Sequence, residues 1–150
     1  MSFTLTGVHH VGITVRDIAT SVEWYRTMFG LEAGPVNHGE GEALGRALQV
    51  PGTVLSFSMI QIGSTRIEFL QYHEPPGKPF DRTNGDIGSA HVCFEVDDLD
   101  AAYRDLEERG AVFNAPPNEI TEGPLAGSRW AYLRDPDGIQ LEIWESPKAS

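Results

Sequence analysis

Hydrophobic and polar residues alternate in two stretches of this chain, 6–16 and 89–96. A period of two residues is typical of a β-strand with one buried face. Each stretch is followed by apolar residues at helical spacing, over 17–29 and 98–109. Both helical segments begin with an aspartate suited to cap a helix and end before a glycine suited to stop it. The two halves of the chain therefore begin with the same predicted strand–helix unit.

Each half continues with further predicted strands. In the first half we expect a short strand over 31–36, a short helix over 42–48, and a hairpin of strands 54–62 and 65–72. In the second half we expect a short strand over 111–114, a Pro-rich loop over 115–125, and a hairpin of strands 128–134 and 138–145. The segment 73–86 is rich in Pro and Gly and connects the halves.

The order β-α-β-β-β therefore occurs twice, which constrains the fold more than any local propensity. A chain of 150 residues suits one domain, 1–150, built from a module at about 6–73 and a module at about 88–146. The predicted class is α+β. Two tandem βαβββ modules form a curved mixed-sheet cup with the helices outside.

Two histidines and two glutamates occupy matching positions in the halves. His10 and His91 open the alternating stretches, and Glu68 and Glu142 lie in the last predicted strand of each half. The alternation places the apolar neighbours of all four residues on the helix side of each sheet, so the four side chains face the other way. A single histidine or glutamate in a strand more often has a structural role. Four such residues at matching positions of a repeat, all facing the same way, indicate that they share one functional site.

Two imidazoles and two carboxylates form a mixed nitrogen and oxygen ligand set. The set suits one divalent metal ion (Ni, Co, Mn, Fe or Zn) with open positions for water or substrate, held by His10, Glu68, His91 and Glu142. His9 falls on the apolar parity and is assigned a structural role. His38 and His73 fall in predicted loops without a partner pattern.

The amino-acid composition limits the kinds of partner that we expect the protein to bind. A formal net charge of −11 argues against nucleic acid and anionic membranes, both of which attract Lys and Arg. No apolar run approaches the ~20 residues that span a bilayer, and the first residues lack a secretory signal pattern. The single Cys93 cannot form an internal disulfide and fits a cytoplasmic location. A small molecule is the expected partner.

The doubled unit, with HHVGITVRDI, AHVCFEVDDL and LRDPDGIQLEI, resembles the vicinal oxygen chelate superfamily, which includes glyoxalases, epimerases, extradiol dioxygenases and bleomycin resistance proteins. The resemblance covers nearly the whole chain and implies a metalloenzyme that is often a homodimer. It carries the metal positions over to the four residues above. The set is similar to that of bacterial glyoxalase I and of methylmalonyl-CoA epimerase, but residues matching a glutathione site are missing.

The leading expectation is a metal-dependent isomerase, epimerase or glyoxalase-type lyase that transfers a proton next to a carbonyl. Glu142 or Glu68 would carry the proton. Two alternatives stay open: an extradiol-type Fe(II) dioxygenase, and a small-molecule binding or resistance protein. For Arg66, contact with an anionic substrate or a salt bridge to Glu68 or Glu142 are both open. By parity, the residues expected to line the substrate cavity are Thr14, Arg66, Leu70, Cys93, Gln140 and Trp144.

Overall fold

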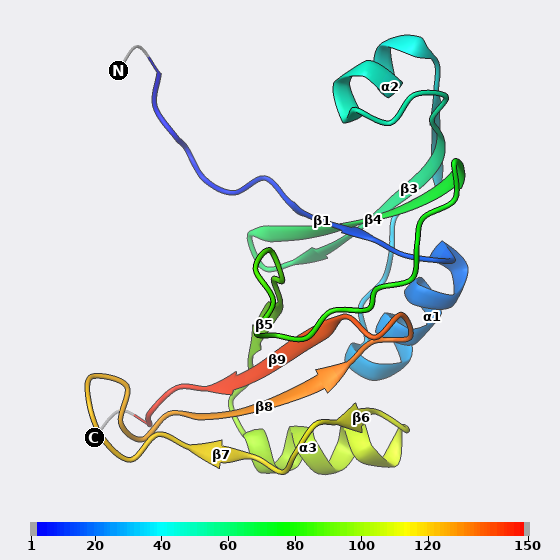
Figure 1. Ribbon diagram of the computed structural model, residues 1–150. Helices are drawn as coiled ribbons and strands as arrows, with labels where there is room; N and C mark the ends of the chain where they lie inside the picture. Colours follow the sequence, from blue (N-terminus) through cyan, green and yellow to red (C-terminus); the bar gives the residue numbers. More distant parts are fainter. Residues whose placement is uncertain (1–2, 149–150) are drawn as a thin grey trace. The chain divides into compact units, whose positions relative to one another are not determined.

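The computed structural model describes residues 3–148. The chain divides into two compact units, Met1–Pro79 and Phe80–Ser150, and the division falls inside the predicted connector. Each unit contains one mixed sheet with the predicted order of elements (Figure 1). The fold is therefore α+β, with two β-α-β-β-β modules as the repeat predicts, and the second module contains one additional short strand. Among the described residues, no helix has the length and apolar character needed to cross a membrane.

The first sheet has the strand order β1-β4-β3-β2. Strand β1 (Val11–Thr14) runs parallel to β4 (Thr65–Glu74), because the chain crosses over through a helix before it returns. Strand β3 (Val54–Ile62) pairs antiparallel with β4 through a tight hairpin, and β2 (Asn37–Glu40) pairs with β3 at the edge. This order places β4, which carries Glu68, in the interior of the sheet.

Helix α1 (Ile18–Phe29) covers one face of the first sheet, and the short α2 (Glu42–Leu48) follows β2. Asp17 caps α1 as predicted, since its side chain accepts from the Thr20 amide. Gly30 ends α1 in a left-handed conformation, with φ of 67°, that favours glycine. Tyr25 of the helix packs against Phe69 of the sheet, with ring centroids 4.9 Å apart.

The second sheet has the strand order β5-β9-β8-β6. Strand β5 (Val92–Glu95) runs parallel to β9 (Gln140–Glu145), which forms a hairpin with β8 (Arg129–Arg134). Two short strands, β6 (Val112–Phe113) and β7 (Asn118–Glu119), pair with β8. Strand β9 therefore occupies the same interior position as β4, and it carries Glu142.

Helix α3 (Leu99–Glu108) covers one face of the second sheet. The buried Glu145 of β9 accepts a hydrogen bond of 2.7 Å from the Leu99 amide at the start of this helix. In the first unit, Gln71 of β4 does the same for the Ile18 amide at 3.0 Å. Each interior strand thus carries a glutamate on one face and, three residues later, a side chain on the other face that anchors the helix.

Two strand predictions were wrong. Segment 31–36 contains only an isolated bridge at Ala33, and the edge strand lies over Asn37–Glu40 instead. Pro35 has no N–H for a strand ladder, so regular pairing with β3 begins after it. In the second half, the segment expected to be a Pro-rich loop contains β7. Its pairing with β8 is a tertiary effect that the local composition does not reveal.

The opening strands are shorter than the alternation predicted. Ile13 and Val15 are buried, as expected for the helix side, but Val11 is 40% exposed and does not pack there. Val11 is the first residue of β1, at the end of the strand away from its connection to α1. The alternating pattern therefore extends beyond the region that the helix covers.

Candidate metal centre

Each unit presents a histidine and a glutamate from neighbouring parallel strands. His10 lies directly before β1 and His91 directly before β5. Glu68 is in register with Gly12, and Glu142 is in register with Cys93. The apolar residues that flank both glutamates are 0–1% exposed on the helix side of their sheets: Ile67, Phe69, Leu141 and Ile143. Both glutamates therefore project from the opposite face, as the parity argument predicts.

In the first unit, His10 and Glu68 form a loose pair. The Nε2 atom of His10 lies 3.4 Å from Oε2 of Glu68, and the two side chains are 37% and 16% exposed. No second hydrogen-bond donor to Glu68 is found among the described residues. The carboxylate thus has one weak contact and partial access to solvent.

A chain of side chains leads to this pair from Arg66. Its Nη1 atom lies 2.9 Å from Nε2 of His9, and Nδ1 of His9 lies 2.7 Å from Nδ1 of His10. A guanidinium only donates, so a neutral His9 accepts on Nε2 and carries its proton on Nδ1, which it donates to His10. Arg66 also donates through Nε to Gln61 at 2.8 Å. These contacts orient the His10 ring. Of the two roles open for Arg66, the salt bridge with Glu68 does not form.

In the second unit, His91 and Glu142 form a tighter pair. The Nε2 atom of His91 lies 2.9 Å from Oε2 of Glu142, and the side chains are 37% and 12% exposed. Tyr132 of β8, in register with Glu142, donates its hydroxyl to the same carboxylate oxygen at 3.3 Å. Its hydroxyl is also 3.2 Å from Nε2 of His91. The three groups meet at one point.

The surroundings of Glu142 shift the titration of its neighbours. Removal from water, followed by the nearby Glu142 carboxylate, raises the pKa of the Cys93 thiol to about 12. The same two causes, in the same order, raise the pKa of the Tyr132 phenol. Both groups therefore stay protonated near neutral pH and present hydrogen atoms toward the carboxylate.

Within residues 3–148, no group of three or more His, Cys, Asp or Glu side chains is arranged to hold a metal ion. What the structure brings together is two separate pairs, His10 with Glu68 and His91 with Glu142. The joining of both pairs into one centre stays a prediction.

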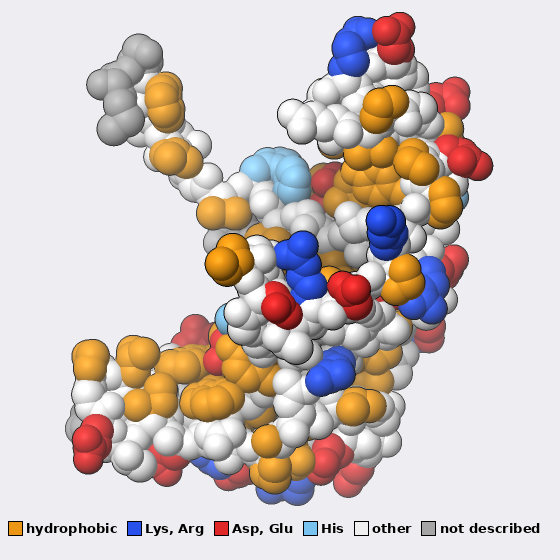
Figure 2. All heavy atoms as spheres, in the orientation of Figure 1, with side chains coloured by type: hydrophobic (Ala, Val, Ile, Leu, Met, Phe, Trp, Pro, Cys, Tyr) orange, Lys and Arg blue, Asp and Glu red, His pale blue; other side chains and the backbone are white. Residues whose placement is uncertain are grey.

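The residues expected to line a cavity have varied surroundings. Leu70 faces Gly12 in the first unit, where a side-chain carbon on the glycine would lie 3.3 Å from Leu70 Cδ1. Thr14, the last residue of β1, is exposed and in register with Leu70. Gln140 is 6% exposed and Trp144 is paired in register with Trp130. Hydrophobic side chains gather over β8 and β9 on the face visible in Figure 2.

The remaining histidines differ from their predictions. His9 does not lie on an apolar face; it is exposed, because β1 begins only at Val11 and the alternation does not extend back to it. His38 and His73 lie in strands β2 and β4, and both contact the buried Ser56 hydroxyl, at 2.9 and 2.8 Å. Sequence reasoning missed this cluster because it joins three strands across a bulge.

Sequence reasoning also missed Tyr132, although a signal was present. Tyr132 alternates with the buried apolar residues Ala131 and Leu133, so it projects from the opposite face of β8, where it pairs with residue 142. The tyrosine therefore had to share a face with the glutamate.

Comparison with known proteins agrees with the fold. Residues 7–143 match the Glyoxalase/Bleomycin resistance protein/Dioxygenase superfamily. The chain is 34% identical to a 2-epi-5-epi-valiolone epimerase from Actinomyces, over 93% of this chain and 79% of that protein. It is 27% identical to the mitochondrial methylmalonyl-CoA epimerase of Bos taurus, over 71% of this chain and 56% of the other.

Among solved structures, a glyoxalase family protein from Bacillus cereus has a TM-score of 0.79 at 24% identity, covering 97% of both chains. This likeness concerns the fold. The match to the superfamily spans nearly the whole chain and includes all four residues of the two His–Glu pairs. The chain belongs to the glyoxalase/bleomycin resistance protein/dioxygenase superfamily.

Proposed function

We propose that this protein is a divalent-metal-dependent epimerase or isomerase that moves a proton at a carbon next to a carbonyl group. The repeated His–Glu pair on the open face of each module is the observation that carries the proposal. The relatives named as epimerases support this reaction type over a lyase. Methylmalonyl-CoA epimerase is about twice as long as the region matched here, so its substrate is not transferred.

The two pairs fit a metal ion by their donor chemistry. Adjacent ligands of one cation, bound at about 2.0–2.2 Å and roughly at right angles, lie roughly 3 Å apart. The observed separations of nitrogen and oxygen are 2.9 Å in one pair and 3.4 Å in the other. We propose that His10, Glu68, His91 and Glu142 serve one ion (Ni, Co, Mn, Fe or Zn), with the pairs drawn from one chain or from two. Bound there, the ion supplies a Lewis acid for negative charge that develops on a substrate oxygen.

The two glutamates have different roles in this proposal. Glu142 is held by His91 and by the Tyr132 hydroxyl, so it is a fixed, positioned group. Glu68 has one contact at 3.4 Å and is free to turn toward a substrate. Glu68 is therefore the residue that takes the proton from carbon and returns it, over a hydrogen-bond distance.

Metal analysis tests the first half of the proposal. Purified protein should contain close to one divalent ion per chain, and His10→Ala/His91→Ala should lose most of it. His38→Ala is the matched control, because this histidine contacts Ser56 and belongs to neither pair. Full occupancy in the double variant would exclude these histidines as ligands.

Isotope exchange tests the second half. In heavy water, the enzyme should exchange the hydrogen next to the carbonyl of an accepted substrate for deuterium. The panel should include 2-epi-5-epi-valiolone, methylmalonyl-CoA and simple 2-oxo acids. Oxygen uptake with a catechol after Fe(II) loading, without exchange, would instead favour a dioxygenase. Neither activity across the panel would favour a binding protein.

We also propose a homodimer. The N-terminal segment carries exposed apolar side chains at Phe3, Leu5 and Val8, which are 66–82% exposed. Apolar side chains gathered on a surface favour burial against a partner. Light scattering after size exclusion should give about twice the 16.5 kDa chain mass. A monomer at micromolar concentration that still holds the metal would contradict the dimer.

A further inference from the structure

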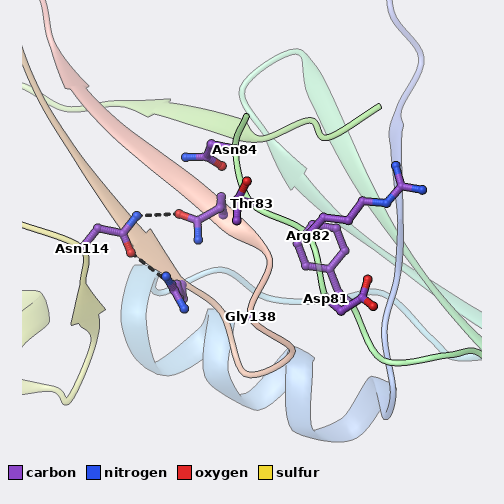
Figure 3. Close-up of a pocket in the computed structure, with 9 residues that line it drawn as sticks. Asp81, Arg82, Thr83, Asn84, Asn114 and Gly138 are labelled. Atoms are coloured by element: carbon purple, nitrogen blue, oxygen red, sulfur yellow. Dashed lines mark hydrogen bonds between the residues drawn. The ribbon is translucent and has the colours of Figure 1, made fainter. Parts of the chain in front are cut away.

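The second unit contains a cavity of about 450 Å³. The segment 80–84 forms one wall, and Asn114, Arg134, Gly138 and Gln140 form the other (Figure 3). All of these residues belong to Phe80–Ser150. The volume lies in the range typical of small-molecule sites.

The cavity adjoins the His91–Glu142 pair. Gln140 precedes Glu142 by two residues on β9, and Arg134 follows Tyr132 by two residues on β8. Residues two apart on a strand point to the same face and lie about 7 Å apart. A ligand of the size of a six-membered ring can therefore reach from this cavity to the carboxylate.

A directed series of hydrogen bonds shapes one wall. Arg134 donates through Nε to Oδ1 of Asn114 at 3.1 Å, and Asn114 donates through Nδ2 to Oε1 of Gln140 at 2.7 Å (Figure 3). Because a guanidinium cannot accept, this order fixes the orientation of both amides. The Nε2 group of Gln140, whose side chain is almost fully buried, is left to donate to a ligand.

The opposite wall offers acceptors as well as donors. Thr83 donates its hydroxyl to Asp86 at 2.9 Å, so its oxygen has only lone pairs to offer. The Asp81 carboxylate likewise only accepts. Arg82 donates one Nη1 hydrogen bond to the Ile87 carbonyl at 2.9 Å and keeps further N–H groups on its guanidinium. Phe80 adds an aromatic surface.

We infer that this cavity binds the vicinal hydroxyl groups of a polyhydroxylated ring. A hydroxyl both donates and accepts, which matches walls that carry both kinds of group. An ionised carboxylate or a fully ionised phosphate ester only accepts and would meet the acceptor oxygens of Asp81 and Thr83 without a proton between them. The net charge of −11 further disfavours an anionic ligand. The inference rests on the proposed function, in which the reacting carbon then belongs to a hydroxylated ring ketone.

Titration calorimetry with myo-inositol tests the inference, because this ring polyol has no carbonyl and cannot react. Arg82 and Asn84 lie in an exposed loop outside both sheets, so Arg82→Ala and Asn84→Ala should leave the sheets intact. Each should weaken binding by about 2- to 12-fold, the value of one hydrogen bond. Arg104→Ala, which removes the same charge from the exposed face of α3, is the matched control and should leave binding unchanged.

Three results would overturn the inference. The first is that the native protein does not bind the polyol at millimolar concentration. The second is that both cavity variants bind the polyol as tightly as the Arg104→Ala control. The third is that inorganic phosphate or succinate binds more tightly than the polyol in a way that depends on Arg82. Measuring polyol binding and isotope exchange separately on the native protein distinguishes this inference from the proposed function. Polyol binding that persists while isotope exchange is absent in the native protein would refute only the proposed reaction. Exchange without polyol binding would refute only the cavity assignment.

Discussion

The two modules carry the same His–Glu pair in different surroundings. Glu68 stands between Gly12 and Met59 in register, whereas Glu142 stands between Cys93 and Tyr132. The second glutamate therefore has hydrogen-bond donors on both neighbouring strands, and its distance to histidine is 2.9 Å instead of 3.4 Å. The repeat preserves the groups suited to bind a metal, and the strand neighbours decide how firmly each glutamate is held.

A second difference lies two residues before each glutamate. In the first module Arg66 stands there and donates to Gln61 and His9. In the second module Gln140 stands there and accepts from Asn114 beside the cavity. One module thus uses this position to orient a histidine, and the other uses it to shape a binding site.

The largest expected effect separates the two glutamates. Glu68→Gln at saturating metal should lower deuterium exchange by roughly 10²–10⁴-fold, the usual contribution of a general base. Glu142→Gln should mainly weaken metal binding, so that excess metal restores much of its exchange. The opposite pattern, with excess metal rescuing only Glu68→Gln, would reverse the two roles.

The next effect concerns the tyrosine that only the second module has. Tyr132→Phe removes the hydroxyl that contacts both Glu142 and His91. Loss of such a supporting contact typically weakens metal affinity by about 10–100-fold. Met59→Leu, at the equivalent position of the first module, is the control and should change affinity by less than about twofold. Equal effects of the two substitutions in a metal titration would show that the tyrosine contact is irrelevant.

A smaller effect contrasts the two hairpin turns. The first hairpin turns at Gly63-Ser64, whereas the second contains the buried Asp135, whose Oδ1 accepts from the Asp137 and Ile139 amides. Burial, with Asp137 as a lesser cause, raises the pKa of Asp135 from 3.8 to about 6. The folded state then holds the proton more tightly than the unfolded state, so this group's contribution to stability falls as pH rises from about 4 to about 6.

Asp135→Asn keeps the acceptor oxygen and removes the charge. It should raise the free energy of unfolding at pH 7 by about 1–2 kcal/mol. This is less than the roughly 3 kcal/mol that 1.36 kcal/mol per pKa unit gives for the whole shift, because the new amide N–H groups replace Oδ2, a buried atom without a hydrogen-bond partner among the described residues. It should also flatten the stability profile between pH 4 and 6. Urea unfolding at several pH values measures both effects. Ser64→Ala serves as the control in the other hairpin, and an unchanged profile in Asp135→Asn would contradict the raised pKa.

The smallest effect is expected at Gly12, the counterpart of Cys93. An alanine there would bring Cβ to 3.3 Å from Leu70 Cδ1, which is the end of a flexible side chain. Leu70 can shift by a few tenths of an ångström, so the free energy of unfolding should change by less than about 1 kcal/mol. A loss above about 2 kcal/mol in urea unfolding would show that the first module needs glycine at this position.

Several features follow from the sequence alone. The alternation in 6–16, the aspartate caps and the turn residues determined the element order, because these signals depend only on neighbours along the chain. The same parity placed Glu68 and Glu142 opposite the buried Ile67 and Leu141, as the structure confirms. The resemblance of the repeated motifs to the vicinal oxygen chelate superfamily agrees with the family that the comparison shows.

Tertiary pairing decided the rest. The edge strand lies over Asn37–Glu40 and not over 31–36, and β7 lies in the segment expected to be a Pro-rich loop. Each of these strands forms by pairing with a strand that is distant in the sequence. Arg66 donates hydrogen bonds to Gln61 and His9 and not to a glutamate. His38 and His73 both contact the Ser56 hydroxyl. These contacts also depend on which strands pair. Local sequence sets which way a side chain points, whereas the atoms that it meets depend on strand register and bulges.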